Sequence, residues 1–203
     1  MIDIERELDQ AERGLPRGGA PADVLKRLAR RAGEEGLVDV AYSQVDSPFG
    51  PLTVAGSERG LLLVAYPERP LDEMLTRLAE EVSPRVLEAP ERLDPVRRQL
   101  DDYFEGRLRS FSEPIDWSLT HDGFFRRVLE ATAKIDYGEV RTYGEVAASA
   151  GSPRAVRATG NGLGSNPMPV VVPCHRVVRA GGGLGGYTGG VERKEFLLSL
   201  ERG

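Results

Sequence analysis

The sequence of 203 residues contains one cysteine and two histidines. A single cysteine excludes an internal disulfide, and so small a set of cysteines and histidines excludes a thiolate zinc site. A lone free thiol is typical of a protein in a reducing compartment. Whatever the role of Cys174, this residue acts without a second thiol.

Long apolar runs are also missing. No stretch approaches the ~18 consecutive apolar residues that a membrane-spanning helix needs. Residues 1–13 carry charges throughout, so we expect neither a secretory signal nor a membrane anchor. With 40% hydrophobic residues the chain can bury a core. These features predict a compact protein of the cytoplasm.

Charge is distributed unevenly along the chain. The net charge is −5 overall, −6 over residues 1–110 and +1 over residues 111–203. Between Arg141 and Val191 there are five arginines and one acidic residue, Glu145. A basic segment of this kind can contact phosphates, although ordinary charge segregation produces imbalances of the same size.

The first half predicts helices followed by short strands. Residues 2–13 and 20–31 predict two short helices around a Gly/Pro break, and we assign them no activity. The segments "VDVAYSQV", "PLTVAG" and "GLLLVAY" predict a small antiparallel meander, because turn residues separate them. Helical apolar spacing then recurs from Leu71 and from Leu93, and "EPIDW" is a candidate edge strand.

The second half predicts a pair of helices that follows a longer one. Apolar spacing over residues 124–135 predicts a helix of about three turns. A short helix over residues 143–150, a turn at Gly151, and a second helix with Ser152 as N-cap and Pro153 at its first position match a helix-turn-helix. Many helical hairpins are purely structural, so this segment alone leaves DNA binding open.

A glycine-rich stretch precedes the terminal helix. Gly181, Gly183 and Gly186 match G-x-G-x-x-G formally, but Tyr187, Thr188 and further glycines intervene before the next helix, which excludes a dinucleotide-binding loop. Two interpretations remain. The loop either brings its backbone close to a flat ligand or is a plain flexible connection.

The stretch "PVVVPCHRVV" contains the cysteine. Its valines predict a strand that Pro173 ends, so that Cys174 and His175 lie on a turn facing a pocket. A thiol becomes a strong nucleophile when a basic group or a positive field removes its proton, and His175 and Arg176 are adjacent. A buried structural cysteine is the alternative.

Three motifs in order resemble one family. "YGEVRTYGEVA", "GSPRAVRATGNGLGSNP" and "PCHRVV", the last followed by "GGYTGGVERKEFLL", are similar to the O6-alkylguanine-DNA alkyltransferases, also called methylated-DNA–protein-cysteine methyltransferases. The likeness runs without a gap from about Phe124 to Glu201 and more loosely from about Val38.

This resemblance implies an α/β fold, with a small antiparallel sheet and helices first and a helical domain with a helix-turn-helix and an active-site loop second. The expected parts are a helical extension of unknown role, an α/β domain, and an alkyltransferase and DNA-binding domain, at residues 1–36, 37–118 and 119–203.

The resemblance also implies a reaction. Cys174 matches the residue that takes an alkyl group from O6-alkylguanine in DNA, with O4-alkylthymine as a further candidate substrate, in one irreversible turnover. His175 matches the base that removes the thiol proton through a water, and Glu201 the carboxylate that orients the imidazole. Asn166 matches a brace of the active-site turn. No cofactor and no metal are implied.

Substrate contacts are implied in the same way, by Tyr143, Arg157, Val177, Tyr187 and Thr188. Arg157 matches the finger that replaces an extruded base, and Tyr143 the residue that crowds the target phosphate and hydrogen-bonds the base. Tyr187 and Thr188 match the walls of the guanine pocket, and the carbonyl of Val177 an acceptor for the guanine amine. The expected partner is double-stranded DNA, bound through its minor groove by a monomer.

Some features depart from the family pattern. Residues 1–36 have no counterpart, which leaves a partner-binding role open. Thr188 stands where serine is frequent, and Thr159 and Asn161 are bulky or polar for the second helix, which leaves alkyl range and DNA affinity open. Two other functions are weighed: a DNA-binding damage sensor that keeps its thiol free, and a Cys-His hydrolase. His121, the other histidine, is expected at the surface.

Overall fold

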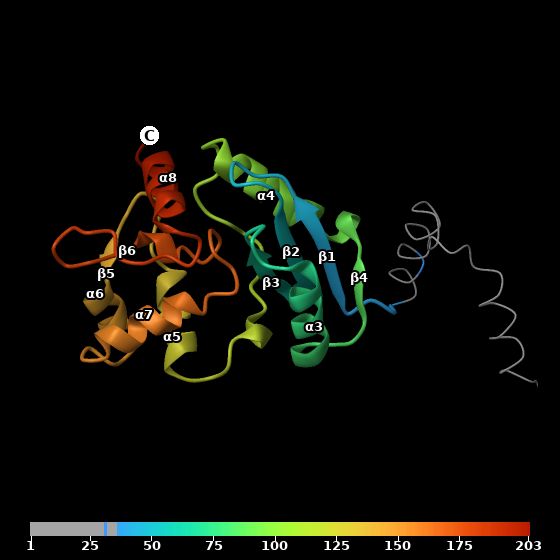
Figure 1. Cartoon of the computed structure of the whole chain (residues 1–203), viewed down its shortest axis with the longest axis horizontal. Helices are drawn as coiled ribbons and strands as arrows, with labels where there is room; N and C mark the ends of the chain where they lie inside the picture. Colours follow the sequence, from blue (N-terminus) through green and yellow to red (C-terminus); the bar gives the residue numbers. More distant parts are fainter. Residues whose placement is uncertain (1–30, 32–35) are drawn as a thin grey trace, which may run out of the picture. The chain divides into compact units, whose positions relative to one another are not determined.

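The computed structural model describes residues 31 and 36–203. The chain divides into two compact units, Met1–Leu37 and Val38–Gly203, and every element labelled in Figure 1 belongs to the second unit. The helices expected at residues 2–13 and 20–31 lie outside the described residues, apart from Arg31.

A four-stranded sheet forms the N-terminal half of the second unit, in the order β3-β2-β1-β4. Its strands are β1 (Val40–Val45), β2 (Leu52–Ser57), β3 (Gly60–Ala65) and β4 (Val86–Glu88). The first three form the antiparallel meander that the sequence predicts. The sequence does not predict β4, which pairs parallel to β1, because three residues are too few to show a period.

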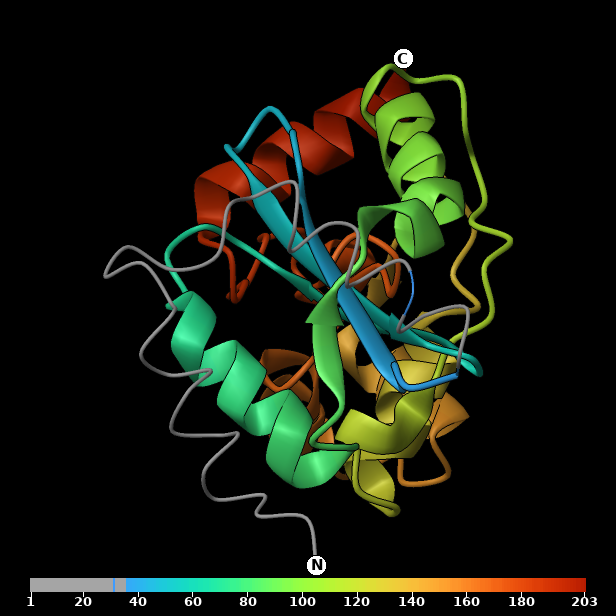
Figure 2. The same cartoon turned by 90° about the vertical axis from the view of Figure 1, so that its right-hand side faces the viewer.

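Helices bury both faces of this sheet. The helix α3 (Leu71–Glu81) packs Met74 and Leu78 into one apolar cluster, and α4 (Asp94–Phe104) packs Tyr103 into another. Figure 2 shows the strands crossing diagonally between these two helices. Strands covered on both faces carry nearly continuous apolar sequence, which explains the run "LLLVA" in β3. Two short 3-10 helices complete this half, η1 (Pro90–Leu93) and η2 (Trp117–Leu119).

The candidate edge strand "EPIDW" is reduced to one bridge. Leu61 donates its amide to Pro114 O at 2.8 Å and accepts from the Asp116 amide at 2.9 Å, so that Ile115 pairs in parallel with Leu61. On one side the ladder ends because Pro114 has no N–H to donate, and on the other the Ser118 amide donates to Asp116 Oδ1 at 3.0 Å instead. Gly60 has a φ of 135°, and a Cβ there would collide with the Pro114 carbonyl, so this close approach requires glycine.

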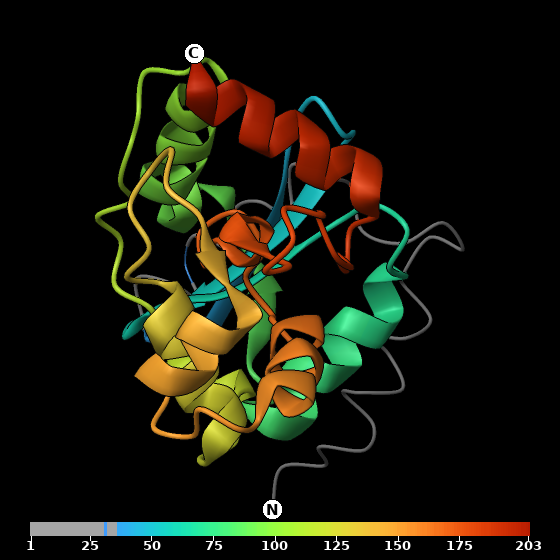
Figure 3. The ribbon, with the colours of Figure 1, turned by 90° about the vertical axis from the view of Figure 1, so that its left-hand side faces the viewer.

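The C-terminal half is mostly helical and lies opposite the sheet in Figure 1. Its elements are α5 (Phe124–Thr132), β5 (Arg141–Thr142), α6 (Tyr143–Ser149), α7 (Val156–Gly164), η3 (Cys174–Arg176), β6 (Val177–Val178) and α8 (Val191–Arg202). The short strands β5 and β6 pair in parallel. Figure 3 shows η3 between α8 and the pair α6 and α7.

The second helix of the helix-turn-helix begins later than the sequence predicts. Ser152 is not its N-cap, because α7 starts at Val156 and the Ala155 amide donates to Ser152 O at 2.9 Å. Ser152 and Pro153 therefore open a tight turn. Proline at the second position of a turn and serine at the first fit this conformation as well as they fit a helix start.

One hydrophobic core joins the two halves. Tyr103 of α4, Leu129 of α5 and Leu197 of α8 belong to the same buried cluster. The main chain is joined as well, since the Val64 amide of β3 donates to Pro167 O at 2.9 Å. The sheet therefore supports the segment that leads to the cysteine.

Candidate active site

A buried turn, and not the predicted strand, leads into Cys174. Residues 169–171 form a turn, and the Val172 amide donates to Met168 O at 2.8 Å. Asn166 holds this turn from within, because its Oδ1 accepts from the Met168 amide at 3.0 Å and its Nδ2 donates to Val172 O at 2.9 Å. Such local side-chain bonds replace a β ladder in a segment rich in proline.

The turn places the thiol at the first position of η3. Asn166 Nδ2 lies 3.1 Å from Cys174 Sγ, and the cysteine is 4% exposed. Val170, also buried, has a φ of 76°, in the left-handed region that β-branched residues rarely adopt. A conformation of this kind costs ~1–3 kcal/mol and persists only where the surrounding packing holds it.

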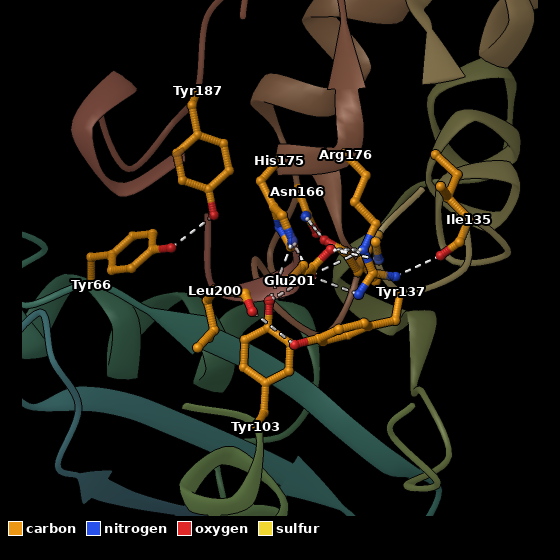
Figure 4. Close-up of polar contacts among 12 residues, drawn as sticks. Tyr66, Tyr103, Ile135, Tyr137, Asn166, His175, Arg176, Tyr187, Leu200 and Glu201 are labelled. Carbon is orange, nitrogen blue, oxygen red and sulfur yellow. Dashed lines mark hydrogen bonds and ion pairs between the residues drawn. The ribbon is translucent and has the colours of Figure 1, made fainter. Parts of the chain in front are cut away.

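A hydrogen-bonded relay connects His175, the residue next to Cys174, with Glu201 (Figure 4). His175 Nε2 lies 2.8 Å from Glu201 Oε1, which also accepts from Tyr103 Oη at 2.6 Å. Glu201 Oε2 accepts from Arg176 Nε at 2.9 Å and from the Gly138 amide at 3.2 Å. The carboxylate of α8 thus accepts from four residues in three separate segments of the chain.

Arg176 is buried, and its side chain bonds to groups inside the protein. It is 6% exposed, donates through Nη1 to Ile135 O at 2.5 Å, and lies 5.7 Å above the ring of Tyr137. Its Nη2 donates to Glu201 Oε1 at 2.9 Å. One of the five arginines in the basic segment is therefore neutralised inside the protein and cannot contact a phosphate.

The relay has a defined protonation state. Burial alone would raise the pKa of Glu201, but hydrogen bonds from His175 and Arg176 outweigh it and lower the pKa to about 2. Burial lowers the pKa of His175, so the imidazole is neutral. Because Nε2 faces the carboxylate, Nε2 carries the proton and Nδ1 the lone pair. Nδ1 has no hydrogen-bond partner among the described residues.

The thiol itself rests in its neutral form. Burial raises the pKa of Cys174 to about 11, although the hydrogen bond from Asn166 Nδ2 and the positive charge of Lys194 both lower it. Lys194 is fully buried and donates to Val177 O at 2.6 Å and to Leu184 O at 2.5 Å. Burial lowers the pKa of this lysine to about 8. Transfer of the thiol proton to a base is thus the step the site has to provide.

Cys174 opens on a cavity of about 490 Å³ in the C-terminal half. The polar and aromatic residues in its lining are Tyr143, Arg157, Arg179, Tyr187 and Thr188. Backbone from the glycine-rich stretch, at Gly185 and Gly186, forms another part of the wall. This size and mixture of surfaces suit a small ligand with both polar and apolar parts.

A helix cap fixes Tyr143 at the cavity. Thr142 Oγ1 accepts from the Glu145 amide at 3.2 Å, and Glu145 Oε2 accepts from the Thr142 amide at 2.6 Å, which is a complete capping box at the start of α6. Tyr143 Oη donates to Gly186 O at 3.4 Å. Gly185 has a φ of 74°, and a Cβ there would lie 2.6 Å from Tyr143 Oη.

The structure places the predicted site residues in two groups. Those that line the cavity are Tyr143, Arg157, Cys174, Tyr187 and Thr188. Those outside this lining are Asn166, which contacts the thiol, and His175 and Glu201, which bond to each other. Val177 stands apart, since its carbonyl accepts from Lys194.

Thr159 and His121, which the sequence also singles out, lie away from the cavity lining. Thr159 faces the interior and donates to Ala155 O at 3.1 Å, so its bulk does not stand on the outer face of α7. His121 is exposed.

Sequence reasoning missed Tyr103, Tyr66 and Lys194. The spacing of α4 marks Tyr103 as core, but no pattern reveals a partner 98 residues away. Tyr66 lies at the end of an apolar strand, and its hydroxyl is 2.7 Å from Tyr187 Oη. Lys194 offers no signal at all, since lysine is almost never fully buried.

The described part of the chain contains neither a cluster of metal ligands nor a membrane-spanning helix. There, no three His, Cys, Asp or Glu side chains cluster so that they could hold a metal ion. Across residues 31 and 36–203, none of the helices combines the length and apolar content that crossing a membrane requires.

Two family models match the chain. Residues 40–117 match the ribonuclease-like domain of 6-O-methylguanine DNA methyltransferase, and residues 123–203 match its DNA-binding domain. The methylated-DNA–protein-cysteine methyltransferase of Methanosarcina acetivorans is 42% identical over 162 residues, which cover 79% of this chain and 97% of that protein. The enzyme of Mycolicibacterium paratuberculosis is 41% identical over 163 residues, which cover 80% and 93%.

Solved structures agree with these relatives. The O6-methylguanine methyltransferase of Mycobacterium tuberculosis aligns with a TM-score of 0.69 at 40% identity, over 80% of this chain and 93% of that one. A structure of the same organism's protein in complex with DNA aligns with a TM-score of 0.69 at 39% identity, over 80% and 92%. The chain therefore belongs to the methylated-DNA–protein-cysteine methyltransferase family, DNA repair enzymes that act by alkyl transfer.

Proposed function

We propose that Cys174 takes the alkyl group from O6-alkylguanine in double-stranded DNA, and from O4-alkylthymine as a second substrate. The observation that carries this proposal is a thiol that opens on a cavity in front of the buried relay of His175 and Glu201. Sulfur bonds to the alkyl carbon as the bond from carbon to O6 breaks. The electron pair goes to the guanine, which takes up one proton. A thioether is not hydrolysed, so each molecule acts once.

His175 acts as the base in this step. Its Nδ1 carries the lone pair and is the ring nitrogen that Glu201 leaves unoccupied. We infer that the proton of Cys174 reaches Nδ1 through one water. The Glu201 carboxylate then stabilises the imidazolium, as the acid does in other nucleophilic triads. Asn166 supports the thiolate by donating to Sγ and by bracing the turn.

The helix-turn-helix gives access to the base. A guanine inside duplex DNA is out of reach of a thiol, so the nucleotide is flipped out at a cost of a few kcal/mol. Arg157 is exposed and lines the cavity. Its side chain enters the base stack and fills the space that the flipped nucleotide leaves. Tyr143 crowds the target phosphate and hydrogen-bonds the base. Ala158 and Gly160 have small side chains, which let α7 approach the minor groove closely. The minor groove carries little information about base identity.

Tyr187 and Thr188 form the walls around the flipped guanine. The backbone N–H of Thr188 donates to O6, where it assists departure of the base. The carbonyls of Cys174 and Val177 accept from the guanine amine. A carbonyl has two lone pairs, so Val177 can accept from the guanine and from Lys194 together.

The remaining assignments follow the family. We infer an α/β domain over residues 37–118 and an alkyltransferase and DNA-binding domain over residues 119–203, which accords with the two matched family models. Residues 1–36 form an extension without an assigned role. The protein acts as a monomer in the cytoplasm and needs no cofactor or metal.

The test is the mass of the intact protein after incubation with duplex DNA that contains O6-methylguanine. We expect a gain of one methyl group at one-to-one stoichiometry, absent from Cys174→Ser. No gain in mass despite tight binding would overturn the transfer and favour the damage sensor. Repeated turnover of an ester would favour the Cys-His hydrolase.

A further inference from the structure

A residue of the sheet half contacts the wall of the cavity. Tyr66 directly follows β3, is 6% exposed, and has its hydroxyl 2.7 Å from Tyr187 Oη, although 121 positions separate the two. Figure 4 shows the two hydroxyls facing each other. Tyr187 lines the cavity together with Cys174 and lies edge-on to His175, with ring centroids 6.4 Å apart. The position of Tyr66 therefore bears on the space above the thiol.

A clamp holds Tyr66 in place. The Arg193 guanidinium of α8 lies 4.4 Å from the centroid of the Tyr66 ring. Glu68 accepts from Arg193 Nη1 at 3.0 Å and also from Nη2, so the pair is bidentate. Arg193 Nη1 donates in addition to Gly189 O at 3.0 Å. Stacking and a two-point ion pair fix the ring of Tyr66 against both α8 and the glycine-rich loop.

The loop has no spare room between the two tyrosines. A Cβ at Gly189 would lie 2.9 Å from Tyr187 Cε1 and would collide with the ring of Tyr66. The main chain therefore runs tightly between the rings. Tyr187 can shift toward Tyr66 only if the ring of Tyr66 or this backbone moves as well.

We propose that Tyr66 is a positioning residue that sets the room for the alkyl group between Tyr187 and Cys174. This inference rests on the proposed function. A methyl group needs Tyr187 close, because a small group leaves the remaining space empty. A benzyl group needs more room and tolerates a displaced wall. Tyr66 therefore tunes the protein toward small alkyl groups.

The experiment compares single-turnover rates on two duplexes, one with O6-methylguanine and one with O6-benzylguanine, for the wild type and Tyr66→Phe. Loss of the hydroxyl leaves Tyr187 without this partner, and one hydrogen bond corresponds to a change of about threefold to tenfold. We expect the methyl rate to fall by about threefold and the ratio of methyl to benzyl rates to fall by a similar factor. DNA affinity, measured in the Cys174→Ser background, stays unchanged.

Tyr42→Phe is the matched control. Tyr42 lies on β1 of the same sheet but packs against the apolar cluster of Met74 and Leu78 on the other face. The ratio of methyl to benzyl rates in Tyr42→Phe therefore stays at the wild-type value. Tyr187→Phe removes the same hydrogen bond from the other partner and must give the same shift. The double variant must add nothing further.

Three results would overturn the inference. The first is that the methyl and benzyl rates both stay at their wild-type values in Tyr66→Phe or in Tyr187→Phe. The second is an equal loss for both alkyl groups, which marks a purely structural role. The third is absence of any adduct on the wild-type protein with either duplex, which would also overturn the proposed function and is thereby distinguished from the other two.

Discussion

Tyr103 and His175 meet on one oxygen of Glu201, at 2.6 Å and 2.8 Å. Tyr103 belongs to α4, in the sheet half, whereas His175 and Glu201 belong to the C-terminal half. The relay of His175 and Glu201 is therefore completed by the other half of the molecule. A tyrosine hydroxyl that donates to a buried carboxylate makes a strong, charge-assisted bond.

Tyr103→Phe tests this bond. The change leaves a buried carboxylate with one donor fewer, so we expect the free energy of unfolding to fall by about 1–3 kcal/mol. The alkyl transfer rate also falls, because the pKa of Glu201 rises toward its usual value and the carboxylate orients His175 less firmly. Urea unfolding and single-turnover rates measure the two effects.

Tyr137→Phe is the control for Tyr103→Phe. Its hydroxyl donates to Leu200 O at 3.2 Å, which is a neutral and half-buried bond. We expect a smaller loss of stability and an unchanged transfer rate. Equal effects of the two changes would show that the charge on Glu201 is not what makes Tyr103 important.

Glu201 makes stability depend on pH. Its pKa falls from 4.5 to about 2 on folding, so its contribution is complete above pH 4.5 and is lost as the pH falls toward 2. Glu201→Gln removes this contribution and leaves the buried charge of Arg176 unpaired, at a cost of about 3–5 kcal/mol near neutral pH. The difference in stability between wild type and variant therefore narrows between pH 4.5 and pH 2.

Urea midpoints at a series of pH values measure this difference directly. Other carboxylates with lowered pKa values, among them Asp39 and Asp116, contribute equally to both proteins and cancel. A constant difference from pH 6 to pH 2 would contradict the assigned role of Glu201.

The sequence predicts elements whose signals are local. The short apolar segments and turns of β1 to β3 and the helical apolar spacing of α3 to α5 are confirmed, because each of these signals lies within the element itself. The valine run fails as a strand because the amide of Asn166 satisfies the local backbone and lets a turn form instead. Ser152 fails as a cap because a serine–proline pair serves turns as readily as helices.

The site residues likewise differ in whether a local sequence pattern predicts them. Cys174 and His175 are adjacent, so their motif is visible in one line of sequence. Tyr103 and Tyr66 act through contacts with residues 98 and 121 positions away, and no periodicity encodes such pairs. Burial of Arg176 likewise depends on meeting Glu201 in the folded protein.

Arg157→Ala tests the proposed role of Arg157 in DNA binding apart from the chemistry at Cys174. Arg157 is exposed on α7, so Arg157→Ala changes the free energy of unfolding by no more than about 0.5 kcal/mol. Transfer from a flipped guanine in DNA slows by at least about tenfold, because nothing then fills the gap in the stack. Transfer from free O6-benzylguanine, which needs no flipping, stays unchanged. Arg98→Ala on α4 is the control, and an equal loss on DNA and on the free base would count against the finger role.

Gly185→Ala tests whether the loop must pass close to Tyr143. Gly185 has a φ of 74°, and its new Cβ would lie 2.6 Å from Tyr143 Oη, so the loop or the ring has to shift within the cavity. We expect a loss of about 1 kcal/mol or more in stability, from the left-handed backbone, and a lower transfer rate on DNA. Gly182→Ala is the matched control, because Gly182 also has a left-handed φ, of 81°, and nothing lies within 4 Å of its Cβ position. A similar loss of stability in both variants with a lower transfer rate in Gly185→Ala alone would show that the contact with Tyr143 requires this glycine, whereas a fully active Gly185→Ala would mean that the loop is free to move away from Tyr143.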